Sequence, residues 1–172
     1  MIPHTSNWDF PLGIMVRSIL RLNSTKYLGK SQLFKPPFGF IFRSLGGYPV
    51  DRSKNNNLVD AVVELFNSKE KFSIALAPEG TRKKVPKLKK GFYYISKKAK
   101  VPIIMIGFDY QGKCIKINEP FLPSDNILKD FKYIIDFFST CKGVYPENGV
   151  DESTFNNMKK ELEEIQKKQS QI

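Results

Sequence analysis

The stretch SIALAPEGTR, residues 73–82, carries the strongest indication of fold class in this sequence. Residues 73–77 form an apolar run that ends at Pro78. A run of this kind predicts a strand that is buried on both faces, as the strands of parallel sheets are. A second apolar run, residues 101–110, predicts a second buried strand. Strands with two buried faces need helices on both sides of their sheet, so we expect an α/β fold.

Predicted helices alternate with predicted strands along the chain. Apolar residues at helical spacing predict helices over residues 10–22, 55–68, 91–100, 126–138 and 151–168. Strands are expected at residues 26–29, 46–52, 73–77, 101–110 and, as a half-exposed edge strand, 113–118. This order is typical of a single α/β domain with a mainly parallel sheet flanked by helices. We expect that domain over residues 1–150, with residues 151–172 as a charged, peripheral C-terminal helix.

Charge and composition restrict the functional class. The 172 residues carry 28 Lys and Arg against 17 Asp and Glu, a net charge of +11, which predicts attraction to anions such as nucleic acid, an anionic membrane or phosphorylated ligands. One histidine and the distant Cys114 and Cys141 argue against a structural zinc site and a disulfide framework, so a reducing compartment is expected. Neither a secretory signal nor a spanning segment is expected. The longest apolar stretch, residues 10–22, is interrupted by Arg17 and Arg21.

The only histidine of the chain lies in HTSNWD, residues 4–9. Imidazole is the side chain that most readily exchanges a proton near neutral pH, and a nearby carboxylate can orient it. Because Pro11 fits only the first turn of a helix, the helix should begin near Trp8 or Asp9, with His4 on the preceding loop. In that arrangement His4 and Asp9 can meet. On spacing alone, a loop histidine and an ordinary helix-capping aspartate are the simpler interpretation.

Two further stretches contain candidates for anion binding. In GGYPVDR, residues 46–52, Arg52 can pair with Asp51 or present its planar guanidinium to a phosphate. The loop after the first buried strand reads EGTR, and ligands of open α/β sheets bind beyond the carboxyl ends of strands. There Glu79 can pair with an arginine or bind a substrate hydroxyl, and the alternative is a solvated turn.

Each other residue of the EGTR loop also suits a ligand. Gly80 lets a ligand approach the backbone, Thr81 offers a hydroxyl and Arg82 offers a guanidinium. A basic run follows, which is either a solvated loop or a source of attraction for an acidic substrate: Lys83, Lys84, Lys87, Lys89 and Lys90.

Read together, these blocks resemble the ordered boxes of the glycerolipid acyltransferases related to bacterial 1-acyl-sn-glycerol-3-phosphate (lysophosphatidate) acyltransferase. HTSNWD resembles the HxxxxD motif, GGYPVDR the second box, APEGTR the third and VPII, residues 101–104, the fourth. The resemblance covers residues 3–121. It implies a glycerol-phosphate acyltransferase-like fold and a membrane-associated transferase of lipid metabolism and phospholipid biosynthesis.

The resemblance also implies the reaction and the roles of residues. A fatty acyl group would pass from acyl-CoA or acyl-carrier protein, as co-substrate, to the hydroxyl of a lysophosphatidate-type acceptor, forming phosphatidate. His4 would be the general base and Asp9 would orient it. The acceptor and its phosphate would be held by Arg52, Glu79, Gly80, Thr81 and Arg82. No metal or other cofactor is implied, and the protein would be cytoplasmic, peripheral at the inner face of the membrane.

Two departures from the family pattern and several alternatives accompany this interpretation. A strand usually precedes HxxxxD, so we expect an acyltransferase domain that is short at its N-terminus, and the helix at 151–168 lies outside the pattern.

The acceptor can instead be another lyso-lipid or glycerol 3-phosphate. A basic protein that binds lipid or nucleic acid without turnover is a different class, although the basic residues are scattered and no RRM, KH or zinc-finger pattern is present. The aromatic stretch KPPFGFIFR, residues 35–43, suits either a membrane interface or the core.

Overall fold

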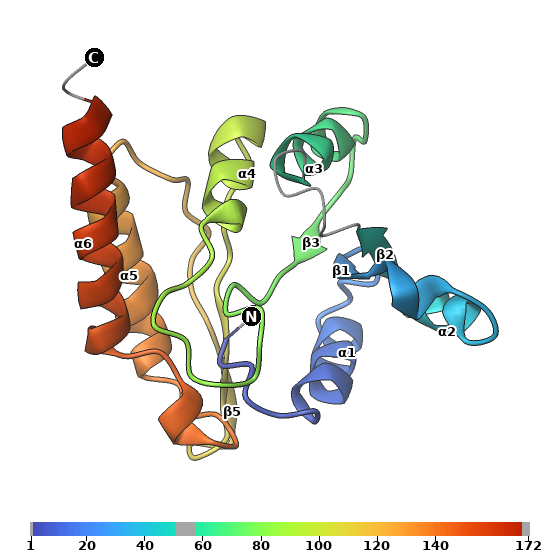
Figure 1. Cartoon of the computed structure of the whole chain (residues 1–172). Coiled ribbons are helices and arrows are strands. Elements are labelled where there is room, and N and C mark those ends of the chain that lie inside the picture. Colours follow the sequence, from blue (N-terminus) through green and yellow to red (C-terminus); the bar gives the residue numbers. More distant parts are fainter. Residues whose placement is uncertain (1, 51–57, 170–172) are drawn as a thin grey trace. The chain divides into compact units, whose positions relative to one another are not determined.

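The computed structural model describes residues 2–50 and 58–169 (Figure 1). The chain divides into two compact units. The N-terminal unit comprises residues 7–76, and the C-terminal unit comprises residues 1–6 together with 77–172. Each unit contains helices and its own small sheet, which confirms the α/β class.

The N-terminal unit contains a three-stranded parallel sheet in the order β2-β1-β3. Tyr27 pairs with both Gly47 and Ala75, so β1 lies in the middle of the sheet. The expectation of a mainly parallel sheet is confirmed here. Its elements are α1 (Asp9–Ile19), β1 (Lys26–Lys30), η1 (Ser31–Phe34), α2 (Gly39–Ser44), β2 (Gly47–Val50), α3 (Leu58–Asn67) and β3 (Ile74–Ala75).

The strand expected at 73–77 is present but differs from the prediction. It spans only Ile74–Ala75, and its side chains are half-buried instead of being enclosed on both faces. The reason is its place in the sheet: among the described strands β3 has only β1 as a neighbour and is an edge strand. The expected helix at 55–68 is observed from Leu58, and its first three residues lie outside the described part of the chain, as do residues 51 and 52 of the expected strand at 46–52.

Three glycines pack against Phe34 in the N-terminal unit, two of them against its ring and one against its backbone. A Cβ on Gly29 would lie 2.8 Å from the ring, one on Gly47 would lie 2.7 Å from it, and one on Gly39 would overlap the Phe34 carbonyl oxygen. Phe34 is 4% exposed, and its ring also contacts Phe42 edge to face. Phe34 therefore links α2 to the sheet. Its ring packs on the backbone of Gly29 in β1 and Gly47 in β2, and its backbone packs on Gly39 in α2.

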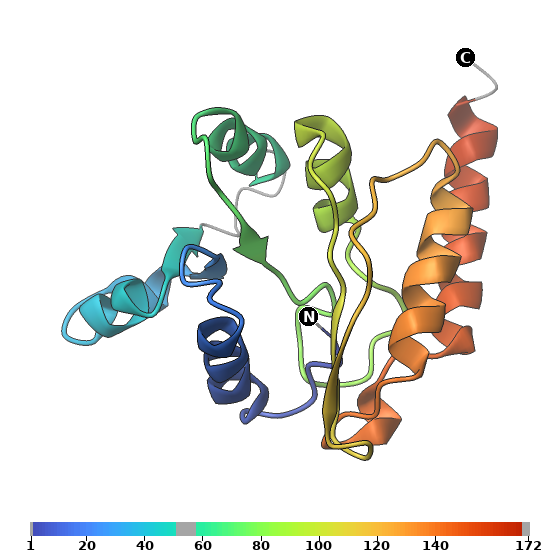
Figure 2. The ribbon, with the colours of Figure 1, turned by 180° about the vertical axis from the view of Figure 1, so that it is seen from behind.

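The C-terminal unit packs α4, α5 and α6 with an antiparallel pair of strands, β4 and β5, in which Ile106 pairs with Ile117. Figure 2 shows α5 and α6 side by side along their lengths. The elements are α4 (Gly91–Ala99), β4 (Ile106–Asp109), β5 (Cys114–Ile117), α5 (Ile127–Ser139), η2 (Pro146–Asn148) and α6 (Glu152–Gln169). The strands expected at 101–110 and 113–118 are thus observed in shorter form.

The core of this unit is formed mainly by α5 and its neighbours. Met158 and Leu162, both 2% exposed, bring the apolar stripe of α6 into that core, so the C-terminal helix buries one face and leaves its charged face outside. The buried hydrophobic cluster consists of Ile2, Val85, Leu88, Tyr93, Met105, Phe131, Ile134, Ile135, Phe138, Val150, Met158 and Leu162.

One buried polar network fixes the start of α5. The Asn126 side chain accepts from the Lys129 N–H at 3.0 Å, which caps the helix. The Tyr93 hydroxyl donates to Asp130 at 2.8 Å, and Asp130 also accepts from the Ser124 N–H at 2.6 Å. Burial, reinforced by Asp130, raises the pKa of Tyr93 well above its ordinary value, so this phenol stays a hydrogen-bond donor. In the described residues, no helix has the combined length and apolar character that crossing a bilayer requires.

The glycines around Phe34 make a testable difference. We expect Gly39→Ala to lower the free energy of unfolding by about 2 kcal/mol or more, because its Cβ meets backbone that cannot move aside. Gly91→Ala is the matched control, since nothing lies within 4 Å of its Cβ and alanine favours the first turn of α4. Urea unfolding followed by circular dichroism measures both. Equal stability of the two variants would contradict the packing described for Phe34.

Candidate functional site

The segment before His4 is held by backbone hydrogen bonds to β4. The Ile2 N–H donates to the Ile106 carbonyl at 3.2 Å, and the Phe108 N–H donates to the Ile2 carbonyl at 3.2 Å. These bonds form a parallel bridge between Ile2 and Gly107, and Ile2 is fully buried. Ile2 therefore pairs with β4 in the manner of a parallel strand. This pairing fixes the backbone two residues before His4.

His4 and Glu79 are brought together although they are 75 residues apart. The His4 N–H donates to both carboxylate oxygens of Glu79, at 3.0 Å to Oε1 and 3.2 Å to Oε2. Glu79 is only 3% exposed. A buried carboxylate needs such hydrogen bonds, and a bond to an ionised acceptor is stronger than one between neutral groups. The first and third sequence blocks thus meet at one charge-assisted hydrogen bond.

This contact differs from those that sequence reasoning considered for Glu79. An arginine and a substrate hydroxyl are the expected partners and stay predictions; the contact described here is with a backbone N–H. No pattern of side chains reports on a backbone donor, so the sequence contains no signal for the contact. Both carboxylate oxygens have further lone pairs, so acceptor binding by Glu79 stays a prediction.

The EGTR loop turns sharply after Glu79. Gly80 has φ +69°, in the left-handed region that glycine adopts without strain, and its N–H donates to the Ala77 carbonyl at 3.1 Å. A Cβ at Gly80 would lie 2.8 Å from Lys89 Nζ, so the absence of a side chain leaves room for that lysine. Thr81 and Arg82 are exposed, as a role in ligand binding requires.

Thr5, next to the histidine, was not among the predicted site residues. It is 4% exposed, its hydroxyl oxygen accepts from the Tyr145 N–H at 3.4 Å, and a Cβ on Gly143 would lie 2.5 Å from that oxygen. The loop after α5 therefore clamps the residue that follows His4. Its position beside the histidine is the only sequence signal that singles it out.

The roles predicted for two site residues, Asp9 and Arg52, stay untested predictions. Asp9 is the first residue of α1, with Trp8 at the cap position, which confirms the predicted start of this helix; its side chain is buried. Asp9 belongs to the N-terminal unit and His4 to the C-terminal unit, so their pairing stays a prediction. Arg52 lies outside the described residues.

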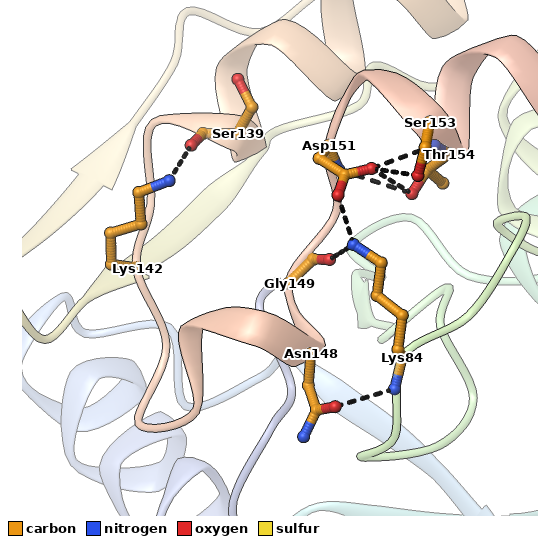
Figure 3. A network of polar contacts seen from close by, with 8 residues as sticks. All are labelled: Lys84, Ser139, Lys142, Asn148, Gly149, Asp151, Ser153 and Thr154. Carbon is orange, nitrogen blue, oxygen red and sulfur yellow. Dashed lines mark hydrogen bonds and ion pairs between the residues drawn. The ribbon is translucent and has the colours of Figure 1, made fainter.

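Three lysines of the basic run form ion pairs with the C-terminal segment. Lys84 Nζ lies 2.6 Å from Asp151 Oδ2 and also donates to the Gly149 carbonyl at 2.6 Å (Figure 3). Lys87 pairs with Glu161 at 2.9 Å, and Lys90 pairs with the same carboxylate. The loop that carries EGTR is therefore held by α6 and by the segment between α5 and α6. Two carboxylates, Asp151 and Glu161, balance part of its positive charge.

Asp151 also caps α6. It directly precedes the helix, and its Oδ1 accepts from the Thr154 N–H at 3.2 Å and the Ser153 hydroxyl at 2.6 Å (Figure 3). The Asp151 N–H donates in return to the Thr154 hydroxyl oxygen at 3.4 Å. This exchange has the geometry of a capping box. One carboxylate therefore starts the helix and anchors the loop through Lys84.

The described residues contain no group of three or more His, Cys, Asp or Glu side chains arranged to hold a metal ion. A family model described as Acyltransferase matches residues 1–109, more than half of the chain. The match includes HTSNWD, GGYPVDR and APEGTR. No curated protein and no solved structure matches this sequence.

The contact between His4 and Glu79 can be tested by substitution. We expect Glu79→Ala to lower the free energy of unfolding by about 1–3 kcal/mol, because it removes the buried acceptor of the part-buried His4 N–H. Glu79→Gln keeps an amide oxygen and should cost less. Amide exchange of His4 by NMR should accelerate in the alanine variant. Glu147→Ala, at an exposed position, should leave the exchange of His4 unchanged, and unchanged exchange in Glu79→Ala would contradict the contact.

The ion pairs predict how stability depends on pH. The hydrogen bond from Lys84, followed by that from Ser153, holds the pKa of Asp151 well below its ordinary value, and Lys90 and Lys87 lower the pKa of Glu161. Carboxylates with lowered pKa values stabilise the fold above their unfolded-state pKa of about 4, and this contribution is lost as pH falls through the folded-state values. Solvent screening limits it to ~0.2–1 kcal/mol per pair, since about half of the Asp151 side chain is exposed.

Two variants separate the roles of Asp151. Asp151→Asn retains a capping oxygen and loses the charge, so its unfolding free energy should fall less between pH 7 and pH 3 than that of the wild type. Asp151→Ala should lose about a further 1 kcal/mol at pH 7 through loss of the cap. Urea unfolding at both pH values measures this. An Asp151→Asn protein with the wild-type pH dependence would show that the carboxylate is not held ionised by Lys84.

Proposed function

The chain belongs to the Acyltransferase family, and on that basis we propose that it transfers a fatty acyl group to a lysophosphatidate-type acceptor, forming phosphatidate. The donor in this proposal is acyl-CoA or acyl-carrier protein. The observation that carries the proposal is the hydrogen bond between the His4 backbone N–H and Glu79, because it joins the histidine of the HxxxxD box to the EGTR box within one compact unit. Residues that act on one substrate must lie close together, and His4 and Glu79 do.

In the proposed reaction His4 acts as general base. Its imidazole takes the proton from the acceptor hydroxyl, and the oxygen attacks the carbonyl carbon of the thioester. The carbon–sulfur bond then breaks, the acyl–oxygen ester remains, and the leaving thiolate takes the proton back from the imidazolium. The sequence has no GxSxG nucleophile elbow, which favours direct transfer over an acyl-enzyme. Asp9 is proposed to orient the imidazole, as the carboxylate of a triad does.

The remaining predicted residues are assigned to the acceptor. Arg52 and Arg82 would bind its phosphate through their planar guanidinium groups, and Thr81 would donate a hydroxyl hydrogen bond. Gly80 would let the acceptor approach the backbone directly after Glu79. The exposure of Thr81 and Arg82 supports this assignment. Glu79 would combine acceptor binding with its hold on the His4 backbone.

The proposal includes the cellular setting of the reaction. An acceptor of this kind resides in a bilayer, so the protein would act in phospholipid biosynthesis as a peripheral protein at the inner, cytoplasmic face of the membrane. The net charge of +11 supports attraction to an anionic surface. No metal or further cofactor is part of the proposed chemistry, since proton transfer and orientation by side chains suffice for it.

The reaction and the base are tested in one assay. We expect wild-type protein to release free thiol from acyl-CoA when lysophosphatidate is present, and His4→Ala to reduce the rate about 10²–10⁴-fold. Asn7→Ala is the matched control, because it changes an exposed residue at one of the variable positions between His4 and Asp9. Asp9→Asn should also reduce the rate while leaving the circular dichroism spectrum unchanged.

The same assay separates the alternatives. A panel containing glycerol 3-phosphate and other lysophospholipids identifies the acceptor, and faster transfer to one of these would replace lysophosphatidate in the proposal. A folded His4→Ala protein with wild-type activity would exclude His4 as the base. Salt-sensitive RNA binding without any thiol release would favour a nucleic-acid-binding protein.

A further inference from the structure

The N-terminal unit exposes apolar side chains around α2. Phe40 is 69% exposed, Phe38 63%, Leu33 44% and Ile41 40%. Exposed apolar residues that occur singly are ordinary. Four of them within nine residues make this segment a candidate for contact with a partner or a membrane. Figures 1 and 2 show α2 beyond β2, at one side of its unit.

This exposure does not result from a poorly packed segment. The Phe34 ring packs against Gly29 and Gly47, the Phe34 backbone packs against Gly39, and the ring of Phe42 contacts that of Phe34 at 6.2 Å between centroids. The backbone of α2 is thus held against Phe34, whose ring packs on β1 and β2. Two aromatic side chains, Phe34 and Phe42, point inward and contact each other. Two others, Phe38 and Phe40, remain exposed and add little to the packing of α2.

The stretch of sequence that carries this patch has charge of one sign only. Between Asp9 and Asp51 the sequence contains no acidic residue, and it contains the basic residues Arg17, Arg21, Lys26, Lys30, Lys35 and Arg43. Lys35 and Arg43 lie at the two ends of the aromatic stretch and are exposed. Arg43 also lies over the Phe34 ring, 5.7 Å from its centroid, which orients its guanidinium at the edge of the patch.

We propose that the α2 surface, formed by Leu33, Lys35, Phe38, Phe40, Ile41 and Arg43, inserts its apolar side chains into the interface of an anionic phospholipid bilayer. Exposed aromatic and aliphatic side chains enter the boundary between headgroups and acyl chains, and flanking bases contact anionic headgroups. A stretch with bases and no acids matches a surface of uniform negative charge. A protein partner would more commonly meet a rim with charges of both signs.

This inference rests on the proposed function, since a bilayer is where the proposed acceptor resides, but its test does not depend on catalysis. Sedimentation with vesicles of phosphatidylcholine alone and of phosphatidylcholine with phosphatidylglycerol measures binding. We expect the wild type and His4→Ala to bind the anionic vesicles equally well. If the wild type binds these vesicles but transfers no acyl group, the proposed function alone is refuted.

The apolar contribution is tested by Phe38→Ser/Phe40→Ser. Binding to the anionic vesicles should weaken at least tenfold, because two large apolar side chains no longer leave water. Leu122→Ser/Tyr145→Ser is the matched control, since it removes two exposed apolar residues (59% and 50% exposed) from the C-terminal unit. The control should bind like the wild type. Equal binding by the Phe38→Ser/Phe40→Ser protein would overturn the proposal.

The electrostatic contribution is tested by Lys35→Gln/Arg43→Gln. Binding to anionic vesicles should fall by about fivefold per base removed, with little change on phosphatidylcholine alone. Lys129→Gln/Lys160→Gln removes the same charge at exposed positions on α5 and α6. A loss of the same size in this control would show that net charge matters and that the α2 surface does not.

A fluorescent variant covers the case in which the serine substitutions impair folding. Phe40→Trp in a Trp8→Phe background places the only tryptophan on the α2 surface. Brominated lipids should quench its emission in anionic vesicles. Absence of quenching, absence of vesicle binding by the wild type, or concentration-dependent self-association through Phe40 in place of lipid binding would each overturn the proposal.

Discussion

The hydrogen bond from the His4 N–H to the buried Glu79 carboxylate is the constraint on which the candidate site depends. A carboxylate with 3% exposure is unfavourable unless donors surround it, and a loop backbone is mobile unless its N–H groups are fixed. The hydrogen bond gives the buried Glu79 carboxylate a donor and fixes the backbone N–H of His4. Once Glu79 is fixed, the positions of Gly80, Thr81 and Arg82 follow from chain connectivity.

The surroundings of this bond come from widely separated parts of the chain. On one side, Ile2 bonds to β4 and Thr5 is clamped by the loop at Gly143 and Tyr145. On the other, Asp151 and Glu161 hold the loop of residues 83–90 through lysines. The family match ends at residue 109, so these acids belong to a segment that the family pattern does not describe. The C-terminal helix thereby gains a structural role, because it restrains the loop after EGTR.

The sequence predicted local features well and contacts between distant residues poorly. Pro11 and Asp9 correctly indicated where α1 begins. This feature depends on residues close in sequence. The strand at 73–77 was overestimated because apolar composition does not reveal whether a strand has one neighbour or two. The bonds of His4 to Glu79 and of Lys84 to Asp151 join residues 75 and 67 apart, and one of them uses a backbone donor.

The aromatic stretch shows why composition alone could not decide between core and interface. Phe34, directly before the stretch, packs against glycine backbone, whereas Phe38 and Phe40 within it remain exposed, and contact with a membrane interface stays a prediction. An exposed phenylalanine contributes nothing to folding through burial, and an α2 that packs by glycines does not need it. Because Gly39 holds α2 by backbone contact with Phe34, the exposed aromatic side chains of this segment are not needed for packing. Phe38 and Phe40 can therefore remain exposed. A helix held in this way can present apolar side chains to a surface without losing its own structure, which is the physical requirement for reversible attachment by a peripheral protein.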